Sequence, residues 1–75
     1  MKGYNGWSSW NEWNVVLWLS NDEGIEQMVR VWIDRGYSKA RINEALREDL
    51  LGTKTPDGAI YNKKSINSYV QQWGE

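Results

Sequence analysis

Tryptophan is concentrated at the start of this chain, where five of its six indoles lie within the first 32 residues. The densest stretch runs from Asn5 to Trp18, which is about the length of one short helix. A domain of 75 residues buries only about 60–65% of its unfolded surface, so its core is small. The indoles must therefore either fill that core or form an exposed surface on which another molecule docks.

The spacing of apolar residues predicts a mainly α-helical, compact single domain over residues 1–75. An irregular arm is expected at residues 1–8, because Gly3 and Gly6 interrupt any regular pattern. Four short helices are then expected at residues 10–19, 22–35, 39–51 and 63–73.

Polar residues mark the starts of these helices and the connection before the last one. Candidate N-caps precede each helix at Ser9, Ser20, Ser38 and Asn62. Ser9 and Ser20 are each followed three residues later by a glutamate, which predicts a capping box. Residues 53–61 are expected to form one short β-hairpin around a Pro-Asp-Gly turn, between the third and fourth helices.

The tryptophans divide by their position on these helices. Three should pack in the core because they fall on inner helix faces, namely Trp13, Trp32 and Trp73. Trp7 lies in the arm, where it either staples the arm to the fold or acts as an exposed anchor. Trp10 and Trp18 cannot both point fully inward unless the first helix is wrapped on several sides. Trp7, Trp10 and Trp18 are therefore the candidate partner-binding residues.

Asn14 interrupts the apolar part of the first helix. A buried carboxamide at this position needs hydrogen-bond partners, and we expect them in the neighbouring N-terminal arm.

Histidine and cysteine are absent, which removes the commonest general base and the usual ligands of transition metals. Asp22, Glu23 and Glu26 stand where carboxylates stabilise the start of a helix. We therefore expect no enzyme activity, no cofactor and no metal site.

The net charge of −1 gives no overall attraction to nucleic acid or to an anionic membrane. The longest apolar run, residues 15–19, is too short to span a bilayer, and no signal peptide is visible, so a cytoplasmic location is expected.

A different function is indicated by the C-terminal half. A TP-x-G-x-x-(W/Y) pattern followed by a helix is carried by Thr55, Pro56, Gly58, Tyr61, Ser65, Ile66 and Val70. On this pattern, residues 38–73 resemble the helix–hairpin–helix tail of serine-recombinase-type DNA-binding regions. The resemblance implies a small winged-helix-like DNA-binding regulator, whose contacts would be Lys54, Lys63, Lys64, Ser65 and Asn67. The other interpretation is an ordinary solvated helix face, and the acidic Glu44, Glu48 and Asp49 nearby would weaken binding to a polyanion.

The stretch from Asn5 to Asp22 fits the pattern N-G-W-x-(S/T)-W-x-x-W-N-V-x-L-W-(L/I)-x-N-(D/E). In this it resembles a group of short, mostly uncharacterised phage and mobile-element proteins, many of which carry Tyr or another residue in place of Trp10. The resemblance implies a setting, a small phage-encoded protein in the host cytoplasm, and no activity or site residue transfers with it. Proteins of that setting often bind host machinery, including defence systems.

Three functions therefore stay open. We expect a non-enzymatic, phage-type interaction protein that binds a host protein complex, such as a defence system, and inhibits or redirects it sterically in an anti-CRISPR-like manner. The alternative is the DNA-binding regulator that uses the hairpin and the last helix. A third possibility is a homodimer formed through the helix at residues 10–19.

Overall fold

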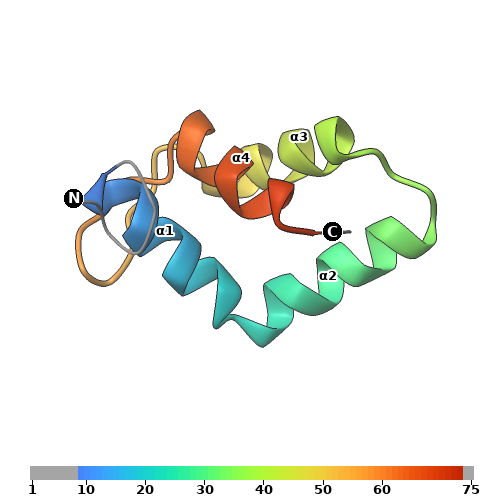
Figure 1. The fold of residues 1–75 in the computed structure, drawn as a ribbon, viewed down its shortest axis with the longest axis horizontal. Coiled ribbons are helices and arrows are strands. Elements are labelled where there is room, and N and C mark those ends of the chain that lie inside the picture. The colour runs from blue at the N-terminus through green and yellow to red at the C-terminus, as the bar shows by residue number, and fades with distance from the viewer. Residues whose placement is uncertain (1–8, 74–75) are drawn as a thin grey trace.

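The computed structural model describes residues 9–73, which fold into four helices (Figure 1). Their bounds are Trp10–Ser20 for α1, Glu23–Asp34 for α2, Lys39–Leu50 for α3 and Lys63–Gln71 for α4. The prediction of a mainly α-helical, compact domain is confirmed. The arm predicted at residues 1–8 lies outside the described residues.

Side chains that accept main-chain hydrogen bonds fix the starts of the helices. Three predicted N-caps are confirmed, at Ser9, Ser38 and Asn62. The second helix differs, because Ser20 still belongs to α1 and the cap is Asp22, whose carboxylate accepts from the Ile25 N–H at 3.1 Å. A carboxylate here also suits the positive end of the helix dipole. The prediction of a capping box opened by Ser20 is therefore wrong.

The core is largely aliphatic and forms where α4 packs against both α1 and α3. Its fully buried apolar members are Val15, Val16, Leu19, Val29, Ile42, Leu46, Ala59, Ile66, Tyr69 and Val70. The second helix contributes only Val29 to this set and packs mainly on α1. In Figure 1, α2 accordingly runs along one edge of the molecule, away from α3.

The tryptophans of the described residues surround this core and do not fill it. Trp32 and Trp73 are half-buried and pack against the core from outside, and Trp13 is also half-buried. The Trp32 ring stacks on Tyr37, and the Trp73 ring meets Tyr69 edge-on. An indole is so large that it is rarely buried completely, and a small core makes complete burial harder still. The predicted core packing therefore takes the form of partial burial at Trp32 and Trp73.

Residues 53–61 contain no strand, so the predicted β-hairpin is wrong. A single bridge pairs Lys54 with Ile60 on either side of the turn, where Gly58 has a φ of +95°. The outer edge of the second arm bonds to α1 instead of to another strand. Asn11 Nδ2 donates to the Ile60 carbonyl at 2.9 Å, and the Ile60 N–H donates to Asn11 Oδ1 at 2.7 Å. The two arms around the turn are too short for a ladder of several hydrogen bonds, and the Asn11 side chain supplies additional hydrogen bonds to the main chain of Ile60.

Asn14 also joins α1 to residues 53–61, through hydrogen bonds made by its buried side chain. Its side chain is only 1% exposed, and its Oδ1 accepts from the Thr55 hydroxyl at 2.6 Å. Its Nδ2 donates to Asp57 at 2.9 Å. The Thr55 hydroxyl in turn accepts from the Ala59 N–H at 3.0 Å, which places Ala59 in the core. These partners come from residues 53–61, so the prediction that they lie in the N-terminal arm is wrong.

Replacing Asn14 by alanine should lower the free energy of unfolding by about 2–3 kcal/mol, because it removes two hydrogen bonds and leaves the buried Thr55 hydroxyl without its acceptor. Denaturant unfolding measures this loss. The double variant Asn14→Ala/Thr55→Val should lose less than the sum of the two single losses, since no hydroxyl is then left unpaired. Strict additivity would contradict the coupling of these two side chains.

Candidate functional site

The outward side of α1 carries an exposed apolar stripe. One side of this helix packs in the core and another holds residues 53–61, as described above. The remaining side presents Trp10 and Leu17, which are 39% and 38% exposed and lie two turns apart on one face. Trp13 lies between them on this face and is half-buried. We call Trp10, Trp13 and Leu17 the α1 stripe.

Trp18 lies on a different side of α1, over the 53–61 loop. It is half-buried, and its indole Nε1 donates to Asp57 Oδ2 at 3.1 Å. With Pro56 and Tyr61 it lines a hollow of 680 Å³ that also includes acidic residues at the start of α2. Burial, followed by the negative charge of Asp22, raises the pKa of Tyr61, so its phenol stays protonated and available as a donor in this hollow.

The three predicted partner-binding tryptophans therefore have different surroundings. Trp10 is the most exposed of those described, whereas Trp18 is held by its hydrogen bond to the loop. Trp7 lies outside the described residues. The structure thus directs attention to Trp10 and its neighbours on the α1 stripe.

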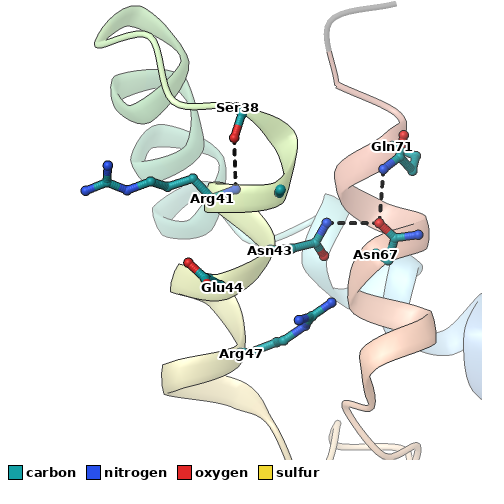
Figure 2. A pocket seen from close by; sticks show the side chains of 8 residues that line it. Ser38, Arg41, Asn43, Glu44, Arg47, Asn67 and Gln71 are labelled. Atoms are coloured by element: carbon teal, nitrogen blue, oxygen red, sulfur yellow. Dashed lines mark hydrogen bonds between the residues drawn. The ribbon is translucent and has the colours of Figure 1, made fainter.

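A polar pocket of 540 Å³ lies between α3 and α4 (Figure 2). The side chains that shape it are Arg41, Asn43, Glu44 and Arg47 of α3 and Asn67 and Gln71 of α4. Figure 2 shows the Arg47 side chain extending from α3 toward α4, whereas Arg41 points away from α4. The guanidinium of Arg41 lies over the Tyr37 ring, 4.4 Å from its centroid. Both arginines line the pocket, and Arg47 is the one that extends across it toward α4.

Two buried polar atoms in this pocket have no hydrogen-bond partner within the described part of the chain. They are Oδ1 of Asn43, a residue only 5% exposed, and Nε of Arg47. The two residues are four apart on α3, so their side chains share one face of the helix. Leaving a buried donor or acceptor unpaired costs about 1–3 kcal/mol each. An unpaired acceptor and an unpaired donor in one pocket are therefore features that need an explanation.

The residues predicted to contact nucleic acid are only partly brought together. Lys63, Lys64 and Asn67 lie exposed on α4, and Lys54 is exposed in the preceding loop. Ser65 is 1% exposed, and its hydroxyl bonds within the capping box at the start of α4. Its side chain is therefore turned into the fold and away from a ligand on the surface.

Sequence reasoning missed Asn43 and Arg47, although one signal for Asn43 was present. Asn43 follows Ile42 and precedes Leu46 by three residues, which places it at the edge of the inner face of α3. A carboxamide at that edge has to be buried beside a partner. That partner, Asn67, is 24 positions away and accepts from Asn43 Nδ2 at 2.9 Å. Local spacing cannot identify a partner at such a distance along the chain.

The chemistry that these sites offer is apolar contact on the α1 stripe and hydrogen bonding in the pocket. Within residues 9–73, no three or more histidine, cysteine, aspartate or glutamate side chains gather closely enough to hold a metal ion. The helices of this same range are all too short or too polar to cross a membrane.

These features define a class, a small helical domain with an exposed aromatic stripe and a separate polar pocket. The chain belongs to a family described as Family of unknown function (DUF7249), whose model matches residues 1–73. The match includes all four helices and both candidate sites. No curated protein and no solved structure matches the chain.

Replacing Asp57 by asparagine should destabilise the protein at neutral pH and leave it almost unchanged in acid. Hydrogen bonds from Asn14 and then from Trp18 lower the pKa of Asp57 below its ordinary value in the folded protein. The stability that this carboxylate adds is therefore fully present above its unfolded pKa of about 4 and is lost as the pH falls through the folded pKa.

Thermal unfolding midpoints of the two proteins, measured from neutral pH to about pH 2, test this linkage. The difference between wild type and Asp57→Asn should shrink as the pH drops below about 4. A difference that stays constant over the whole range would show that the charge of Asp57 adds nothing. Asp49→Asn is the matched control, because Asp49 is an exposed carboxylate on α3, away from Asn14 and Trp18 in the sequence.

Proposed function

We propose that this protein is a non-enzymatic, phage-type interaction protein that binds a host protein complex and blocks it sterically. A defence system is the class of target that we favour. The observation that carries the proposal is the α1 stripe, in which Trp10 and Leu17 expose 39% and 38% of their surface. The phage setting rests on the resemblance of residues 5–22 to short phage proteins.

An exposed indole on a rigid helix is well suited to anchor a protein interface. Tryptophan is enriched among the residues that dominate binding energy, because it brings a large apolar area with few rotatable bonds. Here the helix that presents Trp10 is held on its other sides by the core and by the Asn14 hydrogen bonds. The stripe is therefore presented without a large cost in conformational order.

The rest of the surface supports recognition of a protein more than catalysis. The sequence contains no histidine and no cysteine, and its net charge is −1. Trp18, with the acidic hollow beside it, adds a second surface that a partner on α1 could reach. A second copy of this chain is the other occupant that would cover the α1 stripe, which makes a homodimer the main competing arrangement.

Replacing Trp10 by alanine should abolish capture of the host complex while the helical content is retained. The measurement is affinity capture of tagged wild type and variants from nuclease-treated host lysate, followed by mass spectrometry, with circular dichroism of each variant. Leu51→Ala is the matched control, since Leu51 is an apolar residue that is 47% exposed outside α1.

Leu17→Ser, on the same stripe, keeps the test decisive if Trp10→Ala unfolds. Capture that survives every folded stripe variant would overturn the docking proposal. Light scattering of the pure protein over a range of concentrations separates the remaining case. A dimer that Leu17→Ser dissociates would mean that a second copy, and not a host protein, covers the stripe.

The second candidate function is a DNA-binding regulator, and it is favoured by the exposure of Lys63 and Lys64 beside Asn67 on α4. These side chains lie on the surface, where they are free to approach a phosphate backbone. The acidic residues of α3 oppose such binding, which makes this the weaker of the two proposals.

If this candidate is correct, replacing either Lys63 or Lys64 by alanine should weaken DNA binding and reduce the slope of log affinity against log salt by about one. Fluorescence anisotropy with a labelled duplex at several salt concentrations measures both quantities. Lys39→Ala is the control, because the Lys39 ammonium donates to the Gln71 carbonyl within the fold. Binding that is absent, or insensitive to salt, would exclude this function.

A further inference from the structure

The hollow where α1, α2 and the loop before α4 meet combines aromatic rings with negative charge. Trp18 and Tyr61 supply the rings, and Asp22 and Glu23 supply two carboxylates at the start of α2. The two acidic residues are exposed and the two aromatic residues are half-buried, so solvent reaches the groups that line this hollow. No lysine or arginine in the described part of the chain lines it. We call it the acidic hollow.

The carboxylates of the acidic hollow keep free acceptor atoms. Asp22 Oδ1 accepts from the Ile25 N–H, and its other carboxylate oxygen has no hydrogen-bond partner among the described residues. Glu23 makes no ion pair in this part of the chain, where Arg30 pairs with Glu26 instead. Exposed carboxylates are ordinary by themselves. The aromatic rings beside them therefore decide what the hollow is able to bind.

Both rings are held at the side of the hollow. Trp18 Nε1 donates to Asp57 Oδ2 at 3.1 Å, which fixes the indole against the loop. Tyr61 packs against the core, and burial, followed by the negative charge of Asp22, raises its pKa, so the carboxylate acts on this ring. The face of an aromatic ring attracts a cation, and a carboxylate nearby adds to that attraction. The hollow thus favours a positively charged group over an anion.

The same fold already holds a guanidinium with this combination of groups. Arg30 Cζ lies 5.4 Å from the centroid of the Trp73 ring, and Arg30 Nη2 donates to Glu26 Oε2 at 2.8 Å. Arg41 Cζ lies over the Tyr37 ring at 4.4 Å. A guanidinium is planar and weakly hydrated, so it stacks on a ring and pairs with a carboxylate better than the strongly hydrated ammonium of lysine does. Arginine is therefore the cationic side chain that fits the acidic hollow best.

We propose that the acidic hollow binds an arginine side chain of a protein partner, with the guanidinium against Trp18 and Tyr61 and its N–H groups donating to the two carboxylates. A volume of 680 Å³ accommodates a guanidinium together with its aliphatic stem. Nucleic acid is the unsuitable occupant, because its phosphates would face Asp22 and Glu23. The inference rests on the proposed function in requiring a protein partner, and it names one residue type that this partner must present.

Titration of the ¹⁵N-labelled full chain with acetyl-Gly-Arg-Gly-amide tests this inference. The peptide should cause saturable shifts, in the millimolar range, of the Trp18 indole N–H and the Gly24 main-chain N–H, since both residues line the hollow. Acetyl-Gly-Gln-Gly-amide carries no charge and should cause no saturable shift. Acetyl-Gly-Lys-Gly-amide should bind more weakly than the arginine peptide.

Glu23→Gln removes one carboxylate and leaves the N-cap at Asp22 intact, so it should weaken binding of the arginine peptide about threefold. Tyr61→Leu removes one ring and should weaken binding about threefold as well. Because Glu23 is exposed, its variant keeps the test decisive if Tyr61→Leu unfolds. Glu48→Gln is the matched control and should bind like wild type, because Glu48 is an exposed carboxylate on α3 that does not line the hollow.

Binding of the arginine peptide that neither hollow variant weakens would overturn the proposal, and so would equal binding of the glutamine peptide. Equal binding of the lysine peptide would overturn the choice of arginine. The absence of any saturable shift would overturn both. Trp10→Ala should leave this titration unchanged, because Trp10 does not line the hollow. Loss of host capture in the α1 stripe variants therefore does not decide the outcome, and the two proposals can fail separately.

Discussion

The carboxamide of Asn14 is the point at which the first helix and residues 53–61 are joined. It is buried in α1 beside the apolar Val15 and Val16, and both of its polar atoms are paired with that loop. Thr55, its partner, also holds the Ala59 N–H, so the path from α3 to α4 is fixed against α1. Because a buried carboxamide without partners is so unfavourable, this arrangement strongly disfavours other placements of the loop.

The orientation of α1 determines what the surface of the molecule presents. With one side of α1 against α4 and another against the loop, the remaining side leaves Trp10 and Leu17 39% and 38% exposed. The exposed stripe is thus a consequence of packing elsewhere. The polar pocket arises in a similar way, because α4 is held by α1 and α3 together and leaves Asn43 and Arg47 facing the space between the helices.

Local signals were sufficient to predict the helices, and long-range pairing was not accessible to them. Caps at Ser9, Ser38 and Asn62 act within three residues, so spacing alone reveals them. The predicted hairpin is reduced to one bridge, between Lys54 and Ile60, and the sequence spacing did not reveal that the outer edge of Ile60 bonds to Asn11, 49 positions away. Asn14 and Thr55, 41 positions apart, could likewise be recognised separately as polar residues but not as a pair. For the same reason the sequence named Asn67 only as a candidate DNA contact and did not predict the α3–α4 pocket that it lines.

The contact between Asn11 and Ile60 also blocks a main-chain edge through which copies of this chain could aggregate. Within the described residues, Ile60 and Lys54 form an isolated β-bridge. The Ile60 side chain is 45% exposed. An unpaired edge of this kind is a template on which a second chain can add a strand and begin to aggregate. Because Asn11 already occupies both main-chain groups of Ile60, that template is closed. A domain with so much exposed apolar surface can therefore offer that surface to a partner while its backbone edge stays unavailable for fibrous association.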